Sequence, residues 1–109
     1  MGPQQTRWHV LTYTFDAELW RWEAQQEAAW FFVTVPVEMS DEIGVRFATR
    51  TAGFGSLRVE VTIGTSTWRT SIFPDKQRGA FVLPVKKQVR TKEHLEVGGT
   101  AKVELRVVA

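Results

Sequence analysis

A group of basic residues after Pro84 is the part of the sequence closest to a chemical site. On a helix, Lys86 and Arg90 are four residues apart and share a face, and Lys87 lies beside them. Together with Arg69 from a preceding segment, they form a candidate binding surface for an anion or an acidic partner. The alternative is a short surface helix with its lysines in water, which is the commoner role of such charge runs.

The proline itself supports the anion hypothesis. It presets the backbone for a helix that begins near Val85, and a helix start offers unpaired N–H groups to an anion. Lys86 and Lys87 would then lie in the first turn, where the helix dipole disfavours a cation. A bound anion would account for them, although in water screening makes the penalty small.

Four tryptophans form a second candidate site, namely Trp20, Trp22, Trp30 and Trp68. Aromatic side chains of this kind can line an apolar pocket at the mouth of a barrel. The alternative is core filling, because side chains usually fill the interior of so small a barrel. For Trp68 we expect a structural role, with its ring between a hairpin and the last strand.

Residues typical of catalysis or metal binding do not form a recognisable arrangement. The two histidines, His9 and His94, are far apart, and neither has another metal ligand at helical or hairpin spacing. No serine lies in a G-x-S-x-G motif, and the chain has no cysteine. The sequence therefore predicts no catalytic residue, no metal site and no cofactor.

The elements that must position these residues are mainly strands. Apolar and polar residues alternate, as in half-buried strands, over 11–22, 57–63 and 101–107. Shorter β-rich runs over 29–35, 67–73 and 80–83 are bounded by turn residues or proline. These segments predict a mainly β fold, a small six-stranded antiparallel β-barrel.

Two short helices are expected to cap this barrel, one after Pro36 and one after Pro84. In the first, Ser40 is a candidate N-cap before two acidic residues, and Ile43 and Phe47 would face the core. The second is predicted over 85–95. A faint echo between the two proline-containing segments suggests two similar halves that close one barrel and leave no exposed edge.

The chain length of 109 residues fits one domain. We expect 11–109 to form the β-barrel domain and the polar segment 1–10 to be a flexible N-terminal leader. No segment resembles a signal peptide or is long enough to span a bilayer, so we expect a cytoplasmic protein, monomeric or homodimeric, with no membrane partner. The net charge of +2 argues against nucleic acid as a partner.

Two motifs carry a family resemblance. The segment W-R-T-S at 68–71 is followed by L-P-V-K-K-Q-V-R at 83–90 and by a closing strand after Gly98. This pattern resembles the bacterial domain-of-unknown-function family 1905, from residue 11 to residue 108, although Gly99 stands where that family usually has aspartate. The resemblance implies a double-split β-barrel capped by helices, similar to the fold of AbrB and MazE proteins. It also implies a YdeI-like domain as a candidate partner, but no activity.

Three functions remain open from the sequence. The leading hypothesis is a non-enzymatic binding or accessory domain for an anionic ligand or a partner domain. The first alternative is an AbrB-like DNA-binding regulator, which rests on fold analogy alone. The second is a small enzyme that acts on an anionic substrate held by Lys86, Lys87 and Arg90.

Overall fold

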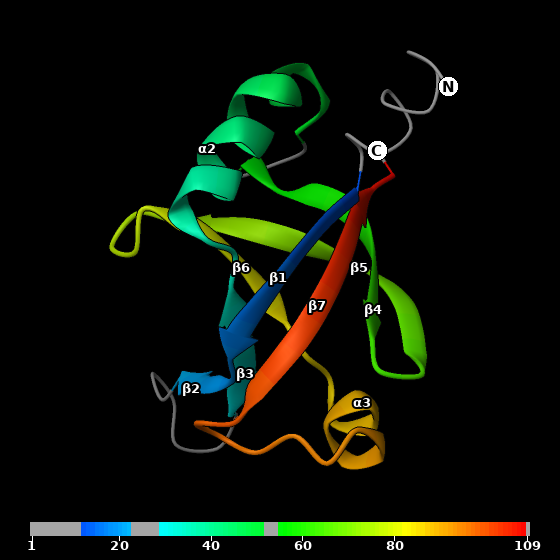
Figure 1. Ribbon diagram of the computed structural model, residues 1–109. Helices are drawn as coiled ribbons and strands as arrows, with labels where there is room; N and C mark the ends of the chain where they lie inside the picture. Colours follow the sequence, from blue (N-terminus) through cyan, green and yellow to red (C-terminus); the bar gives the residue numbers. More distant parts are fainter. Residues whose placement is uncertain (1–11, 23–28, 52–54, 109) are drawn as a thin grey trace.

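The computed structural model describes residues 12–22, 29–51 and 55–108, so the predicted leader over 1–10 lies outside the described residues. Within them the chain forms one seven-stranded antiparallel sheet that curls strongly into a half-barrel (Figure 1). The strands are β1 (Thr12–Glu18), β2 (Trp20–Trp22), β3 (Trp30–Thr34), β4 (Leu57–Ile63), β5 (Ser66–Asp75), β6 (Ala80–Pro84) and β7 (Thr100–Val107). Their order across the sheet is β1-β7-β4-β5-β6-β3-β2.

The prediction of six strands is wrong by one, because the segment predicted as a single strand over 11–22 divides at Leu19. The part before Leu19 pairs with β7, and the part after it pairs with β3. Leu19 itself is buried and exchanges two backbone hydrogen bonds with the turn before β7: its N–H donates to Gly99 and its carbonyl accepts from Gly98. The alternation holds up to Leu19 and then changes phase, because Trp20 and Trp22 stand at the even positions that were polar before, with Arg21 between them. This change of phase marks the division, but it does not reveal the new partner strand.

The core lies on the concave face of the curled sheet. Alternate residues of the central strands point inward and are fully buried, as the sequence predicts, among them Val59 and Val61 on β4 and Val103 and Leu105 on β7. Burying each such side chain contributes roughly 1.5–3 kcal/mol to folding. The predicted closure into a full barrel is not observed in the described chain, because β1 and β2 end the strand order as open edges.

Two short helices lie at opposite ends of the half-barrel (Figure 1). The first, α2 (Val37–Arg46), begins directly after Pro36, which is its N-cap residue and has an extended backbone. The prediction that Ser40 caps this helix is therefore wrong. Ser40 is buried inside the helix, where its hydroxyl donates to the carbonyl of Val35 and accepts from the N–H of Phe81, and so joins α2 to β6.

Both core residues expected on the first helical segment, Ile43 and Phe47, are buried, and a short 3-10 turn over Ala48–Arg50 follows. The second helix, α3 (Lys87–Lys92), is shorter than predicted at both ends. The predicted start near Val85 is wrong because the N–H of Val85 still donates to Phe31 on β3 and Lys86 keeps an extended backbone. The helix ends early because His94 adopts a left-handed backbone with φ of 55°. Hydrogen bonds from the N–H of Leu95 to the carbonyl of Arg90, and from His94 to Thr91, complete a Schellman motif that ends the helix.

Candidate functional site

The sheet opens between β5 and β6. Most of β5 pairs with β4, whereas only its last residues, Phe73–Asp75, pair with β6. If the pairing of Phe73 with Val82 continued in the same register, Ser71 would lie opposite Pro84. The N–H of Val85 donates to the carbonyl of Phe31, and the carbonyl of Phe81 accepts from the N–H of Val35. The odd-numbered residues of β6 therefore direct their backbone groups toward β3, and Pro84 directs its own toward β5.

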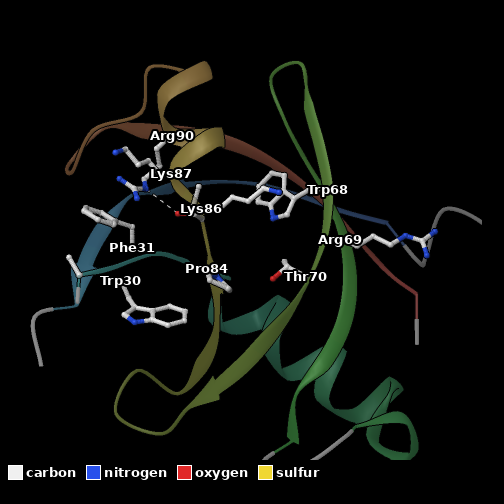
Figure 2. Close-up of a pocket in the computed structure, with 11 residues that line it drawn as sticks. Trp30, Phe31, Trp68, Arg69, Thr70, Pro84, Lys86, Lys87 and Arg90 are labelled. Carbon is white, nitrogen blue, oxygen red and sulfur yellow. Dashed lines mark hydrogen bonds between the residues drawn. The ribbon is translucent and has the colours of Figure 1, made fainter. Parts of the chain in front are cut away.

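Proline has no N–H to donate, and it therefore interrupts the ladder at this position. Beyond it the two strands diverge, and a pocket of about 380 Å³ lies in the opening (Figure 2). Residues from β3, β5, β6 and the start of α3 line this pocket, and none of the described lining residues is acidic. We call it the split pocket.

Three predicted cations, Lys86, Lys87 and Arg90, line the split pocket. The guanidinium of Arg90 lies 3.7 Å from the centre of the Phe31 ring, and its Nε donates to the carbonyl of Val85 at 3.1 Å. Partial burial lowers the pKa of Arg90, which nonetheless stays protonated because a guanidinium does not titrate in proteins. Lys86 and Lys87 are exposed and have no ion pair within the described part of the chain.

The fourth predicted cation, Arg69, borders the same pocket, but its side chain points away from it (Figure 2). Its Nε lies 3.6 Å from a carboxylate oxygen of Glu60 on the outer face of the sheet. Arg106 donates to that carboxylate as well, at 2.6 Å, and lowers the pKa of Glu60. Arg69 can therefore contribute only its main chain to the pocket.

The four candidate tryptophans do not share one site. Trp30 and Trp68 line the split pocket, where Trp68 is half-buried and packs against the core. Trp20 and Trp22 line a different hollow of about 340 Å³, formed with Phe32, Val82 and the turn after β5. There the Nε1 of Trp20 donates to Thr34 at 2.9 Å, and the guanidinium of Arg78 lies 3.6 Å from the centre of its ring.

Sequence reasoning missed Phe31 and Thr70 as residues of the split pocket. Phe31 reaches the cations because β3 pairs with β6, a non-local contact that no local pattern reveals. Thr70 had a usable signal, since alternation on a strand places it on the same face as Trp68 and opposite to Arg69.

A hydrogen-bonded carboxylate closes the far end of the split. The carboxylate of Glu93, just after α3, accepts hydrogen bonds from the N–H and hydroxyl of Thr65, at 3.2 and 3.1 Å, and from the hydroxyl of Ser66 at 2.6 Å. The bond from Ser66 is the main cause of a lowered pKa for Glu93. Because Thr65 and Ser66 belong to the β4–β5 hairpin, these bonds hold α3 against that hairpin.

The described residues contain no group of three or more side chains arranged to hold a metal ion. His94 is exposed at the end of α3, and His9 lies outside the described residues. No helix in the described chain is long and apolar enough to cross a membrane.

The described chain is thus a curled antiparallel half-barrel with a basic, aromatic pocket between two diverging strands. The chain belongs to the family called domain of unknown function DUF1905, whose model matches residues 15–105. No curated protein matches it.

Proposed function

We propose that the protein is a non-enzymatic binding domain whose split pocket holds a small organic anion, a carboxylate or phosphate joined to an apolar or aromatic group. The observation that carries the proposal is the composition of the pocket wall. Lys86, Lys87 and Arg90 stand together with Trp30, Phe31 and Trp68, and no described carboxylate compensates their charge. An anion would supply the missing charge, and the rings would contact its apolar part.

The size of the pocket supports a small ligand. A volume of about 380 Å³ lies near the lower end of the range for small-molecule sites, roughly 300–1,000 Å³. A hydrogen bond to a charged group contributes about 1.5–3 kcal/mol net, so two such bonds and a ring contact support measurable affinity. Among the described residues, those that line the pocket include one hydroxyl, that of Thr70, and no histidine or carboxylate. This composition supports binding over acid–base catalysis.

The finer fold assignment belongs to the same proposal. Two chain segments each serve both halves of the sheet: 12–22, which changes partner at Leu19, and β5, which passes from β4 to β6. This sharing supports a double-split barrel of the AbrB kind.

DNA binding is the less favoured alternative even for such a fold. The cations line a recess between strands, whereas duplex DNA requires phosphate contacts over an extended surface. A cytoplasmic location and a YdeI-like partner domain stay predictions.

Calorimetric titration of the full chain with phenyl phosphate and 3-phenylpropionate tests the proposal. We expect both to bind, and the neutral 3-phenylpropanol to bind at least tenfold more weakly, which corresponds to about 1.4 kcal/mol. The double variant Lys86→Gln/Lys87→Gln should weaken the anions to a similar extent. The matched control, Lys76→Gln/Lys102→Gln, removes two exposed lysines outside the pocket and should leave affinity unchanged.

Equal weakening by both double variants would show a general charge effect and would overturn the proposal. Tight binding of a DNA duplex that depends on Lys86 and Lys87, with no response to either small anion, would favour the regulator instead.

A further inference from the structure

The β4–β5 hairpin determines which backbone groups of β5 face the split pocket. Its turn has two residues, Gly64 and Thr65, so the flanking residues Ile63 and Ser66 form a hydrogen-bonded pair. Along an antiparallel ladder such pairs recur at every second residue. Trp68 and Thr70 therefore direct their backbone groups toward β4, whereas Arg69 directs its N–H and its carbonyl toward the split.

The pairing with β6 agrees with this assignment. Phe73 is four residues from Arg69, so its backbone groups also face away from β4. Phe73 is the residue that pairs with Val82 on β6. The assignment also explains how Arg69 lines the pocket while its side chain contacts Glu60 on the outer face (Figure 2).

Arg69 has no strand partner on this side. The register of β5 and β6 would place Lys86 opposite it, but β6 ends at Pro84 and α3 begins at Lys87. No backbone hydrogen bond within the described chain joins Arg69 to this side of the split. The main chain of Arg69 thus presents one donor and one acceptor to the pocket, held by a rigid strand and close to three cations.

We infer that the ligand of the split pocket is an acylated α-amino acid, as at the carboxyl terminus of a peptide; this inference rests on the proposed function. The complement of an unpaired strand residue is another extended residue, which offers an N–H and an oxygen on the same side. The ligand's amide N–H donates to the carbonyl of Arg69, and its carboxylate accepts from the N–H of Arg69. Lys86 and Lys87 neutralise the carboxylate, and Trp68 contacts its apolar side chain.

The ends of the split favour a chain terminus over the middle of a strand. At one end Phe73 pairs with Val82, and at the other Glu93 binds Ser66. At about 3.3 Å per residue, the seven steps from Ser66 to Phe73 span roughly 23 Å. Because both ends are closed, an extended chain cannot run through the split parallel to β5, but a terminal residue can enter from the open side.

Calorimetry with matched ligands tests the inference. N-acetylphenylalanine should bind at least tenfold more tightly than 3-phenylpropionate, which keeps the ring and carboxylate but lacks the amide. N-acetyl-N-methylphenylalanine, which lacks only the N–H, should lose that advantage, and N-acetylphenylalaninamide, which lacks the charge, should bind at least tenfold more weakly. In nuclear magnetic resonance spectra, N-acetylphenylalanine should shift the backbone amide of Arg69.

Two variants separate the main chain of Arg69 from its side chain. Arg69→Ala keeps the N–H and should bind N-acetylphenylalanine like the parent, whereas Arg69→Pro removes the N–H and should bind it at least tenfold more weakly. The ligand series decides the matter even if the proline variant does not fold.

If N-acetylphenylalanine, its N-methyl analogue and 3-phenylpropionate bind equally well and Lys86→Gln/Lys87→Gln weakens all three, the inference is wrong and the proposed function holds. If none of these acids, nor phenyl phosphate, binds, the proposed function fails as well.

Discussion

The hydroxyl of Ser66 lies 2.6 Å from the carboxylate of Glu93, and this hydrogen bond joins the end of α3 to the β4–β5 hairpin. The two residues belong to elements that do not pair in the sheet. Their contact fixes one wall of the split pocket, which α3 carries, relative to the other wall, which β5 forms. The stability of this contact should therefore affect the shape of the pocket.

Glu93→Gln should lower the melting temperature at neutral pH. In the folded state hydrogen bonds from Ser66 and Thr65 lower the pKa of Glu93 below its ordinary value of 4.5. Their stabilisation is therefore present above that pH and is lost as the pH falls through the folded-state pKa. Thermal unfolding from pH 7 to pH 3 should show the difference between parent and variant shrinking with acidity. The exposed control Glu104→Gln should show no such trend, and a difference independent of pH would contradict the prediction.

Gly64→Ala should destabilise the fold more than Gly79→Ala does. Both glycines have a left-handed backbone, with φ of 59° and 64°, so alanine costs about 1–2 kcal/mol at either position. At Gly64, however, a Cβ would also collide with the carboxylate of Glu93, while at Gly79 it meets open space. Urea denaturation should reveal this extra cost, and in a Glu93→Ala background it should disappear. Equal costs for the two glycines would count against the close contact.

Pro84→Val should narrow the split pocket. Valine restores an N–H opposite Ser71, so the β5–β6 ladder can extend by one further pair. We expect slower hydrogen exchange at the amide of Ser71 and weaker binding of phenyl phosphate. The control Pro74→Val exchanges an exposed proline of β5 that does not line this pocket. Unchanged exchange at Ser71 would mean that another feature holds the strands apart.

Trp68→Ala should cost more stability than Trp22→Ala. Trp68 is half-buried against the core, and the range for such truncations is about 3–5 kcal/mol, of which we expect the lower end. Trp22 is 49% exposed, so its replacement should cost less than about 1 kcal/mol. Chemical denaturation of both variants provides the comparison. A Trp68→Ala variant as stable as the parent would leave Trp68 with a role in binding alone.

Features of the fold that depend on local pattern could be predicted from the sequence. The strand over 57–63 agrees with β4 residue for residue, because one face is buried and the alternation is complete. The change of phase at Trp20 marked the division at Leu19, but the partners of the two parts could not be predicted, since they depend on which distant strands lie alongside. The start of α2 was misplaced because Ser40 followed by acidic residues resembles an N-cap. In the structure its hydroxyl instead accepts a hydrogen bond from the N–H of Phe81 on β6.

The candidate site shows the same limit. Spacing alone brought Lys86, Lys87 and Arg90 together, and the structure places all three at one pocket. The side chain of Arg69 lies outside because residues 68 and 69 of a strand point to opposite faces, a parity that the sequence already contained. The opening of the sheet could not be foreseen, because Pro84 interrupts a ladder only once its partner strand is known.

The pairing of β1 with β7 has a consequence for how the protein folds. Thr12 lies opposite Arg106, so the strand of the described chain that leaves the ribosome first finds its neighbour in the one that leaves last. Joining residues so distant along the chain costs loop-closure entropy before the contacts between the strands can offset that cost. Such topologies therefore fold slowly. During synthesis the apolar face of β1, including Tyr13 and Phe15, therefore lacks the neighbouring strand β7 until β7 emerges from the ribosome.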